Sequence, residues 1–398
     1  MQSSSEGSGP APWNTFVEGD NLDVLPRLAP AYGPFDVVYL DPPYNTGNPF
    51  AYNDRTAGRR ADRHDEWLAT MRPRLEAIRE VTTERGAVFV SIDDHEAARL
   101  RLLMDEVFGE EQFLAQVVVN LNPKGRQLGK GFATSHEYLL VYARSANACV
   151  LNASSPSLVD PRDFPLTAED GRRYRRLPLR NTNKKFNPVT APTMHFAIFG
   201  SPESGRVSTE PFEGALEIKP VFGDGSPAVW RWSAAKIDAQ RDDLVCRWVG
   251  TGERQRADVF QRDWLHEGRR KKLRTIWLAQ EIGSTDTAVT ELKALVGHLF
   301  ESPKPTGLIR RILETMPDDA RVLDPYAGSG TTGHAVALQN DVDGGRRTCV
   351  SVNSAEPVRP GSNADLAGLA RVSDVTRTRL RAVADAVGGG FEEFTLDS

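Results

Sequence analysis

The 398-residue sequence lacks the features that would place it in a membrane or direct it out of the cell. Its apolar runs all fall well short of the roughly 20 residues that a membrane-spanning helix needs. The stretch from Met1 to Pro12 is small and polar, without the apolar segment of a signal peptide. These absences predict a cytoplasmic protein that is not attached to a membrane.

Cysteine is also scarce, which limits metal and disulfide chemistry. The three cysteines, Cys149, Cys246 and Cys349, are far apart and have no Cys or His nearby at metal-ligand spacing. His95 and His136 each stand next to a glutamate, but neither completes a spaced ligand set. We therefore expect reduced, structural cysteines and no metal site.

The sequence lacks the motif of a nucleotide-driven motor. There is no Gly-x-x-x-x-Gly-Lys-Ser/Thr phosphate loop, so the chain has no translocating motor of its own.

The net charge of −5 argues against a uniformly positive surface. Basic residues nevertheless gather in two clusters, which predict local nucleic-acid contacts. The clusters are Arg172, Arg173, Arg175, Arg176, Arg180, Lys184 and Lys185, followed by Arg269, Arg270, Lys271, Lys272 and Arg274. A solvated surface is the alternative interpretation of either cluster.

The first third of the chain has the pattern of a parallel α/β sheet. A short apolar strand, 35–40, ends at a proline pair, and a second strand at 86–92 follows a helix at 67–83. Strand, helix and strand in succession imply a parallel sheet. A helix at 96–108 and strands at 114–120 and 137–142 extend it.

After Ala143 the composition changes and later returns to its earlier character. Up to about Gly268 the chain is rich in Pro, Gly, Arg and Asp, which indicates an inserted, mostly β or irregular module. Regular structure resumes near Thr290. The elements expected there are helices at 290–299, 307–315, 334–339 and 375–387, and strands at 321–323, 348–352 and 391–396. We predict three parts: 1–144, 145–275 and 276–398.

The tetrapeptide Asp41-Pro42-Pro43-Tyr44 suits chemistry on a nucleobase amino group. The lone pair of such a nitrogen is delocalised into the ring, and hydrogen bonds from it to the Asp41 carboxylate and the Pro42 carbonyl would favour a reactive geometry. The prolines stiffen the loop, and Tyr44 could stack on a base rotated out of the duplex. An ordinary strand-ending turn is the alternative.

A glycine-rich turn follows the strand that ends at Leu323. The run from Gly328 to Gly333 also matches the dinucleotide pattern Gly-x-Gly-x-x-Gly, but only about 65 residues remain after it, too few for a second nucleotide-binding half. The acid at the strand tip, Asp324, would disfavour a phosphate and could meet the positively charged methionine end of S-adenosylmethionine. The turn therefore favours that cofactor over a nicotinamide dinucleotide, with simple helix packing as the bland alternative.

Together the two motifs resemble those of the β-class DNA amino methyltransferases, and in particular the modification subunits of type III restriction systems. The resemblance covers nearly the whole chain. The matching segments are Gly19-Asp-Asn-Leu22, Asp41-Pro-Pro-Tyr-Asn-Thr-Gly47, Tyr52-Asn-Asp54, Val90-Ser-Ile-Asp-Asp-His-Glu96, Ser135-His-Glu-Tyr138, Arg231-Trp-Ser233, Pro303-Lys-Pro305, Asp324-Pro-Tyr-Ala-Gly-Ser-Gly-Thr-Thr332 and Gly344-Gly-Arg-Arg347.

The resemblance implies a Rossmann-like methyltransferase sheet that is circularly permuted, with the catalytic half first, an inserted target-recognition module and the cofactor half last. It implies methyl transfer to adenine N6 in double-stranded DNA, by base flipping, within a restriction-modification or related defence system. A homodimer and a restriction or defence subunit are the partners it suggests. The implied catalytic residues are Asp41, Pro42, Pro43 and Tyr44. The implied cofactor residues are Asp20, Lys304, Asp324, Pro325, Tyr326, Ala327, Gly328, Ser329, Gly330, Thr331, Thr332 and Asn353, with Asp20 at the cofactor adenine and Lys304 near its methionine end.

One position departs from the family pattern. Many methyltransferases carry an acid at the tip of the strand after the glycine loop, where this chain has Asn353. An amide both donates and accepts, so it could still bind ribose hydroxyls, and Glu356 is a possible substitute.

Two alternatives stay open at the level of sequence. N4-cytosine methylation uses the same amino chemistry, although the leading Asp41 favours adenine over the Ser common in cytosine enzymes. A non-catalytic DNA-recognition subunit is the second, and the intact catalytic loop argues against it. Trp230 and Trp232 alternate on one face of an expected strand and are interpreted as core rather than base-stacking residues.

Overall fold

The computed structural model describes residues 13–46, 60–125, 131–252 and 255–395. The chain divides into two compact units, one formed by residues 1–154 and 272–398 and the other by residues 155–271. We call them the sheet unit and the inserted unit. The segments Tyr52 to Asp54, Gly47 and the first twelve residues, on which some expectations rest, lie outside the described residues.

The sheet unit is built on a nine-stranded sheet in the described part of the chain. All neighbouring strands are parallel except at β5, which is antiparallel to both β3 and β4. In spatial order the strands are β15 (Ile276–Trp277), β4 (Phe113–Val119), β5 (Glu137–Ala143), β3 (Thr82–Ile92), β2 (Phe35–Leu40), β16 (Arg321–Asp324), β17 (Thr348–Asn353), β1 (Asn14–Glu18) and β18 (Phe391–Thr395).

The middle of the sheet joins the two ends of the sequence. Strand β2 pairs with β16, with Val37 opposite Val322, although the two lie nearly three hundred residues apart along the chain. From β2 the chain proceeds to β3 on one side, and from β16 it proceeds to β17 on the other. The carboxyl ends of β2 and β16 therefore flank a topological switch point, where open α/β sheets bind their ligands. This order is that of a permuted Rossmann-like methyltransferase sheet.

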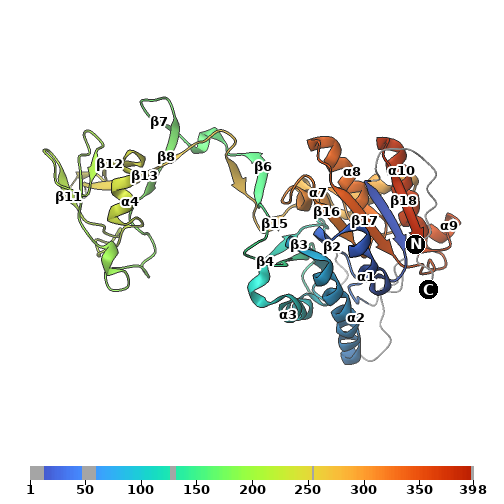
Figure 1. The fold of residues 1–398 in the computed structure, drawn as a ribbon. Helices are drawn as coiled ribbons and strands as arrows, with labels where there is room; N and C mark the ends of the chain where they lie inside the picture. The colour runs from blue at the N-terminus through green and yellow to red at the C-terminus, as the bar shows by residue number, and fades with distance from the viewer. Residues whose placement is uncertain (1–12, 47–59, 126–130, 253–254, 396–398) are drawn as a thin grey trace. The chain divides into compact units, whose positions relative to one another are not determined.

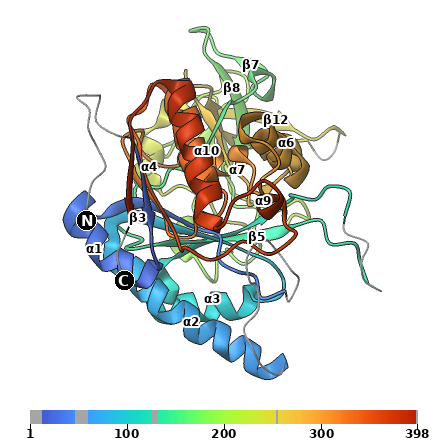
Figure 2. The same cartoon turned by 90° about the vertical axis from the view of Figure 1, so that its right-hand side faces the viewer.

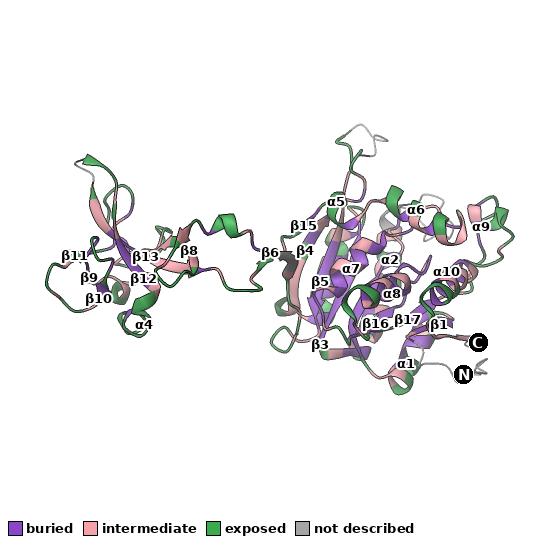
Figure 3. Cartoon of the chain, turned by 90° about the horizontal axis from the view of Figure 1, so that it is seen from above, coloured by how far each residue is buried: buried purple, intermediate pink, exposed green. Residues whose placement is uncertain are grey.

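Helices cover both faces of the sheet (Figures 1 and 2). One face packs against α1 (Asn21–Tyr32), α2 (Arg60–Val81) and α3 (Ala97–Phe108), and the other against α7 (Thr306–Leu313) and α8 (Thr331–Asp343). The alternation within β2 explains this, since Val38 and Leu40 enter the first core while Val37 and Tyr39 enter the second. Figure 3 shows the strands buried between two helix layers whose outer faces are exposed.

Three further helices lie at the cofactor-motif end of the sheet unit. They are α6 (Thr285–Val296), α9 (Asn363–Leu366) and α10 (Val372–Val387), and their apolar faces share a small core that includes Leu292, Phe300 and Val375. A short helix, α5 (Ala279–Ile282), packs against α7.

The inserted unit consists of short antiparallel strands around a core of its own. One sheet contains β12 (Leu244–Val249), β13 (Arg256–Trp264), β8 (Arg173–Pro178) and β7 (Leu166–Thr167); another contains β10 (Val207–Ser208), β9 (Ile198–Gly200) and β11 (Leu216–Ile218). The chain also forms α4 (Ala234–Ala239), and β6 (Ser154–Leu158) pairs with β14 (Arg270–Lys272). Trp230, Trp232 and Cys246 are buried in its core.

Some expected elements differ from those observed. Trp230 forms an isolated bridge to Arg180 and Trp232 lies in a bend, so the expected strand is wrong although both side chains are buried. Strand β1 and helix α1 were not expected. Strand β1 is five residues long and contains buried Asn14 and Glu18, and α1 carries two internal prolines, which normally argue against a helix.

No helix in the described ranges is long and apolar enough to cross a bilayer.

Candidate active site

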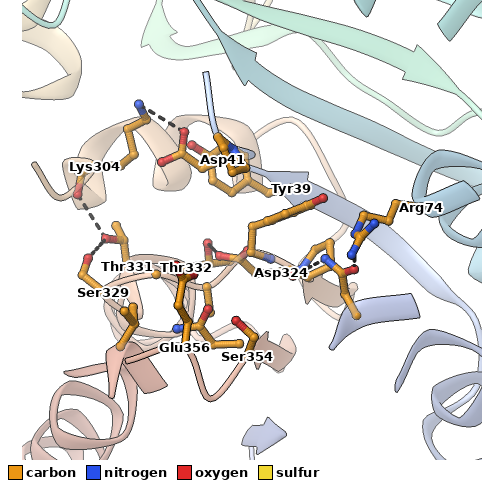
Figure 4. Close-up of a pocket in the computed structure, with 18 of the residues that line it drawn as sticks. Tyr39, Asp41, Arg74, Lys304, Asp324, Ser329, Thr331, Thr332, Ser354 and Glu356 are labelled. Carbon is orange, nitrogen blue, oxygen red and sulfur yellow. Dashed lines mark hydrogen bonds and ion pairs between the residues drawn. The ribbon is translucent and has the colours of Figure 1, made fainter. Parts of the chain in front are cut away.

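A cavity of about 330 Å³ opens at the carboxyl ends of the central strands. Its walls come from the loops after β1, β2, β16 and β17, together with α2 and the segment before α7 (Figure 4). Eleven of the twelve residues expected to bind a cofactor line it, namely Asp20, Lys304, Asp324, Pro325, Tyr326, Ala327, Gly328, Ser329, Thr331, Thr332 and Asn353. The remaining one, Gly330, stands just behind the wall as the N-cap of α8.

The lining of this cavity is rich in carboxylates. Asp20, Asp41, Asp324 and Glu356 face it, against the cations Arg74 and Lys304. Burial raises the pKa of Asp324 to about 7. An acidic lining favours a cationic ligand and disfavours a pyrophosphate, so the donor chemistry fits S-adenosylmethionine better than a dinucleotide.

The glycine-rich turn is shaped by Asp324 and by two glycines with positive φ. One carboxylate oxygen of Asp324 accepts from the backbone N–H of Tyr326 at 3.0 Å, and the other accepts from the Thr332 hydroxyl at 2.5 Å. Gly328 has φ 50° and Gly330 has φ 77°, a backbone region that strains other residues. Asp324 is thus an anchor of the turn as well as part of the cavity wall.

The third glycine of the pattern serves packing. A Cβ on Gly333 would lie 2.6 Å from the side chains of Asn14 and Leu380, which belong to β1 and α10. Helix α8 can approach these elements only because this position has no side chain. This close approach accounts for Gly333 without any ligand.

Asp20 is already occupied by contacts within the protein. Its side chain caps α1 by accepting from the N–H of Leu22 at 2.9 Å, and it pairs with Arg74 at 3.0 Å. Arg74 also donates to Asn21 at 2.7 Å, and Asn21 donates to the Pro325 carbonyl at 3.1 Å. This chain of contacts joins α1 and α2 to the loop after β16 and fixes one wall of the cavity.

The wall after β17 contains both candidates for a ribose contact. Asn353 donates to the Thr376 hydroxyl at 3.0 Å, and Ser354 and Glu356 also line the cavity. Figure 4 shows Glu356 and Ser354 beside each other at this wall.

The loop after β2 is held from beneath by residues that the tetrapeptide pattern did not reveal. The Trp67 indole donates to the Pro43 carbonyl at 2.7 Å. Asn45, with the unusual φ of 57°, donates to the buried Glu96 carboxylate at 2.7 Å, and His64 contacts the same carboxylate at 2.5 Å. Of these, Asn45 and Glu96 belong to segments that the family resemblance included, whereas Trp67 and His64 do not.

Four charged or polar groups converge above this loop. The Lys304 ammonium lies 3.2 Å from the Asp41 carboxylate, 2.8 Å from Glu137 and 2.7 Å from the Tyr44 hydroxyl. The Tyr44 hydroxyl lies 2.9 Å from Asp41 and also contacts Glu137. We call Asp41, Tyr44, Glu137 and Lys304 the carboxylate cluster. The sequence predicts Lys304 near the methionine end of the cofactor. In the structure its ammonium belongs to the carboxylate cluster, and its backbone carbonyl accepts a hydrogen bond from the Thr331 hydroxyl at 3.2 Å.

The electrostatics of the carboxylate cluster follow from burial and from two acids sharing one ammonium. Burial raises the pKa of Asp41; the charge of Lys304 opposes this shift and the charge of Glu137 adds to it. Burial also holds the pKa of Tyr44 well above its ordinary value, so the phenol stays protonated. For Lys304, burial lowers the pKa, but the charges of Asp41 and Glu137 outweigh it and raise the pKa overall.

A second cavity of about 100 Å³ lies on the other side of Asp41. Asp41, Ser302, Pro303 and Lys304 line both cavities. The other residues lining the second cavity are Tyr44, Thr46, Asp93, Asn122, Thr134, His136, Glu137 and Thr285. Asp41 and Lys304 therefore stand where two separate binding spaces meet.

Among the twelve basic residues of the two clusters, six pair with acids of the same chain. The ion pairs are Arg172 with Asp170, Arg175 and Arg269 with Asp263, Arg180 with Asp258, Lys184 with Asp224 and Lys271 with Asp163. Arg173 donates to the Phe164 carbonyl. Within the described ranges, Arg176, Lys185 and Lys272 are exposed and form no ion pair.

Two absences expected from the sequence can be examined in the described residues. There, no group of three or more His, Cys, Asp or Glu side chains could hold a metal ion. The three cysteines are all unpaired.

Comparison with known proteins gives a consistent family. The family model for DNA methylases of the N6 and N4 type matches residues 35–342. The type II methyltransferase M.KpnI of Klebsiella pneumoniae is 32% identical over 92% of this chain and 87% of its own length. The Mod subunit of the type III restriction-modification enzyme EcoPI of Escherichia phage P1 is 33% identical over 93% of this chain, which spans only 62% of that subunit.

Among solved structures, a putative DNA modification methylase from Thermus thermophilus aligns with 96% of this chain and all of its own chain. The identity is 14% and the TM-score is 0.40, too low for this likeness to carry an argument.

Proposed function

The chain belongs to the N6/N4 family of DNA methylases, and from that premise we propose that it methylates the N6 amino group of adenine at specific sites in double-stranded DNA. It is a DNA methyltransferase, and S-adenosyl-L-methionine is its methyl donor. The observation that carries the finer proposal is the position of Asp41, which borders both cavities. One space suits the cofactor and the other suits an extruded base, and the acid that must hold the amino group stands between them.

The residues around Asp41 have defined tasks in this proposal. The Asp41 carboxylate and the Pro42 carbonyl accept hydrogen bonds from the amino group and orient its nitrogen. Trp67 and Glu96 hold the loop in place, so little motion is needed when the base arrives. Tyr44 presents its ring to the second cavity, where a base can stack.

The cofactor would be held by the walls of the larger cavity. The turn from Asp324 to Thr332 forms one side, Asp20 another, and Asn353 with Glu356 a third. When bound, the cofactor supplies an electrophilic methyl group, and its sulfur keeps the electron pair of the broken bond. The protein orients both reactants and excludes water, and positioning of this kind accounts for much of the acceleration.

Adenine is favoured over cytosine by Asp41 itself, since cytosine enzymes often have Ser in its place. N4-cytosine methylation is retained as the competing assignment because the same carboxylate and carbonyl could orient either amino group. A purely DNA-binding role is opposed by the assembly of Asp41, Lys304 and Glu137, which a recognition subunit would not need.

Target recognition is assigned to the inserted unit. Its exposed cations Arg176 and Lys185, and Lys272 directly after it in the chain, would contact phosphates and fix the position on DNA, while other side chains read base edges. The acid-paired arginines would act mainly as structural residues. Reaching adenine N6 requires the base to leave the duplex, so we include base flipping.

The biological setting is also part of the proposal. The EcoPI relative is a Mod subunit of a type III restriction-modification enzyme, and M.KpnI is a type II methyltransferase. We therefore propose a role in restriction-modification or a related defence system, in the cytoplasm, as a homodimer or with a restriction subunit.

Analysis of the product nucleosides tests this proposal. DNA incubated with the protein and S-adenosyl-L-methionine is digested, and N6-methyladenine and N4-methylcytosine are quantified by mass spectrometry. We expect only N6-methyladenine from the wild type and neither product from Asp41→Ala, which should still bind the cofactor within about threefold because Asp41 orients the base. N4-methylcytosine would replace the adenine assignment, and normal activity of Asp41→Ala would overturn the assigned role of Asp41.

A further inference from the structure

Glu137 brings a second carboxylate into the catalytic centre, where it and Asp41 contact the same lysine. It is the first residue of β5 and contacts the Tyr44 hydroxyl and the Lys304 ammonium. Its side chain is only 13% exposed. A buried acid held by the same two groups as Asp41 calls for a physical explanation.

The hydrogen-bond inventory of the carboxylate cluster leaves room for one more proton. The Lys304 ammonium has three protons, and its three neighbours Asp41, Tyr44 and Glu137 take all of them. The Tyr44 hydroxyl has one proton but touches two carboxylate oxygens. If that proton points to Glu137, the 2.9 Å contact between the Tyr44 and Asp41 oxygens has no hydrogen atom. A proton that reaches Asp41 would supply it, and until then Asp41 is a carboxylate.

The surrounding charges favour uptake of such a proton. Two carboxylates face one ammonium, so the carboxylate cluster carries one unbalanced negative charge. Tyr44 stays a neutral phenol and can receive a proton on its oxygen while releasing its own. The other titratable groups facing the carboxylate cluster are Tyr39 from β2, Asp93 after β3, His136 just before β5 and Asp324 from β16.

The reaction itself releases a proton that must go somewhere. When the amino nitrogen bonds to the methyl group it becomes positively charged, and it regains neutrality by losing a proton while the N–H electron pair stays on nitrogen. Asp41 is the acceptor of the amino hydrogen bond, so it is the first group that can take this proton.

From the proposed methyl transfer and this geometry we infer that Glu137 is the final acceptor of the released proton. The proton passes from the amino nitrogen to Asp41; Asp41 then gives a proton to the Tyr44 oxygen as Tyr44 gives its own to Glu137. At the end Glu137 is neutral, and Asp41 and Tyr44 are as they began. Lys304 stays an ammonium throughout and balances the remaining negative charge. Glu137 returns its proton to water through the second cavity, which it lines.

In this series of proton transfers, Glu137 is a positioning and relay residue that acts through Tyr44. The inference rests on the proposed function, because a chain that transfers no methyl group releases no proton. The electrostatic coupling between Asp41 and Glu137 is a property of the cofactor-free protein and can be measured separately.

The first measurement follows the Asp41 carboxyl by carbon-13 NMR in the full, cofactor-free chain labelled at aspartate side chains. The Asp41 signal is identified by its loss in Asp41→Asn. In Glu137→Gln the neighbouring negative charge is gone, so the titration of Asp41 should move to lower pH by about one unit. An unchanged titration curve would overturn the coupling between Asp41 and Glu137 on which the relay depends.

The second measurement is the single-turnover rate of DNA methylation, which is free of product release. Glu137→Gln keeps the shape and can still accept from Lys304, but it is far too weak a base to take a proton, so the rate should fall about 100-fold. Glu137→Asp keeps an ionisable group and should lose no more than about tenfold. Equal losses in the two variants would mean that only the shape of the side chain matters, which contradicts the relay.

Asp94→Asn is the matched control. Asp94 is near Glu137 in the fold, since it accepts from Tyr138 at 3.0 Å, but it does not line either cavity. Its rate and the Asp41 titration should match the wild type. If the wild type itself transfers no methyl group, the proposed function fails, while the NMR titration still decides whether Asp41 and Glu137 are electrostatically coupled.

Discussion

The sheet unit and the inserted unit use their charged side chains in opposite ways. At the carboxyl ends of β2 and β16, acids from separate segments converge around a single lysine and leave excess negative charge in a buried space. In the inserted unit, arginines face aspartates on neighbouring strands and are largely neutralised, as with Arg175 and Asp263. The number of charges in a stretch of sequence therefore says less about ligand binding than their position at strand ends.

The largest expected effect tests whether the two units are energetically separate. Trp230 is 1% exposed and its indole donates to the Phe196 carbonyl at 2.8 Å. Trp230→Ala should destabilise the inserted unit by about 4 kcal/mol, the usual cost of removing a buried tryptophan. We expect calorimetry to show a lower-temperature transition for this unit, while the cofactor affinity of the sheet unit stays within about twofold because its core is distinct.

Trp248→Ala provides the control for that variant. Trp248 lies in the same unit but is 44% exposed, so its replacement should cost less than about 1 kcal/mol. A parallel loss of cofactor binding in Trp230→Ala would show that the units are coupled and that the comparison does not hold.

The next effect concerns the acid that anchors the cofactor turn. Burial raises the pKa of Asp324 to about 7, so the free protein carries it mostly protonated at pH 6 and ionised at pH 8. A cationic cofactor should therefore bind more tightly as pH rises through 7. Asp324→Asn should weaken binding about 100-fold at pH 8, since it removes the charge and disturbs the turn. Calorimetric titration of both proteins at each pH measures this.

The ratio between the cofactor affinities of the wild type and of Asp324→Asn provides the control for this prediction. The cofactor's own amine titrates equally for both, so it cancels, and only the Asp324 contribution remains. A ratio of the wild-type to the Asp324→Asn affinity that does not change with pH would contradict the assigned role of Asp324.

The raised pKa of Asp324 has a second consequence, which concerns the stability of the cofactor-free protein. Between the unperturbed value of 3.8 and about 7 the unfolded state ionises first, so the contribution of Asp324 to stability should decline with rising pH.

The central strands and β1 differ in how clearly the amino-acid sequence predicts them. The central strands could be predicted because each has a short apolar run with a clear end, as at Leu40 before Asp41. Strand β1 could not, because its buried Asn14 and Glu18 break the apolar pattern, and Glu18 is held by Arg371 and Arg377 from distant segments. Partners that meet only in the fold leave no local signal.

The residues of the site also differ in whether the amino-acid sequence predicts their roles. Asp41 and Asp324 were expected from their motifs, and the fold brings both to one cavity. The role of Glu137 depends on β5 running antiparallel beside β3, which places its side chain against the loop after β2. Likewise, the acid pairing of Arg175 depends on the register of β8 against β13. Spacing within one segment contains neither fact.

A smaller effect tests the inserted unit with two adjacent arginines of β8. Arg175 pairs with Asp263 at 2.7 Å, whereas Arg176 is exposed and lies over the Phe260 ring without an ion pair among the described side chains. Arg176→Ala should weaken DNA binding about tenfold and reduce the slope of log K against log salt by about 1. Arg175→Ala should change affinity by less than about threefold, since its charge is already balanced. Equal effects in fluorescence anisotropy titrations would mean that the internal ion pairs open on DNA.

The smallest effect concerns Asn353, where the cofactor motifs depart from the family pattern. Asn353 donates to Thr376, and the Glu356 carboxylate lines the same wall of the cavity. If Glu356 takes over the ribose hydroxyls, Glu356→Gln should weaken cofactor binding about fivefold, because glutamine can still accept from a hydroxyl but has lost the charge that strengthens the hydrogen bond. Asn353→Ala should cost about twofold. The loss in Glu356→Gln should vanish with a cofactor analogue that lacks the ribose hydroxyls, because the contact is then absent in both proteins. A loss that persists with the analogue would place Glu356 in the structure of the wall instead, and would leave Asn353 as the ribose contact.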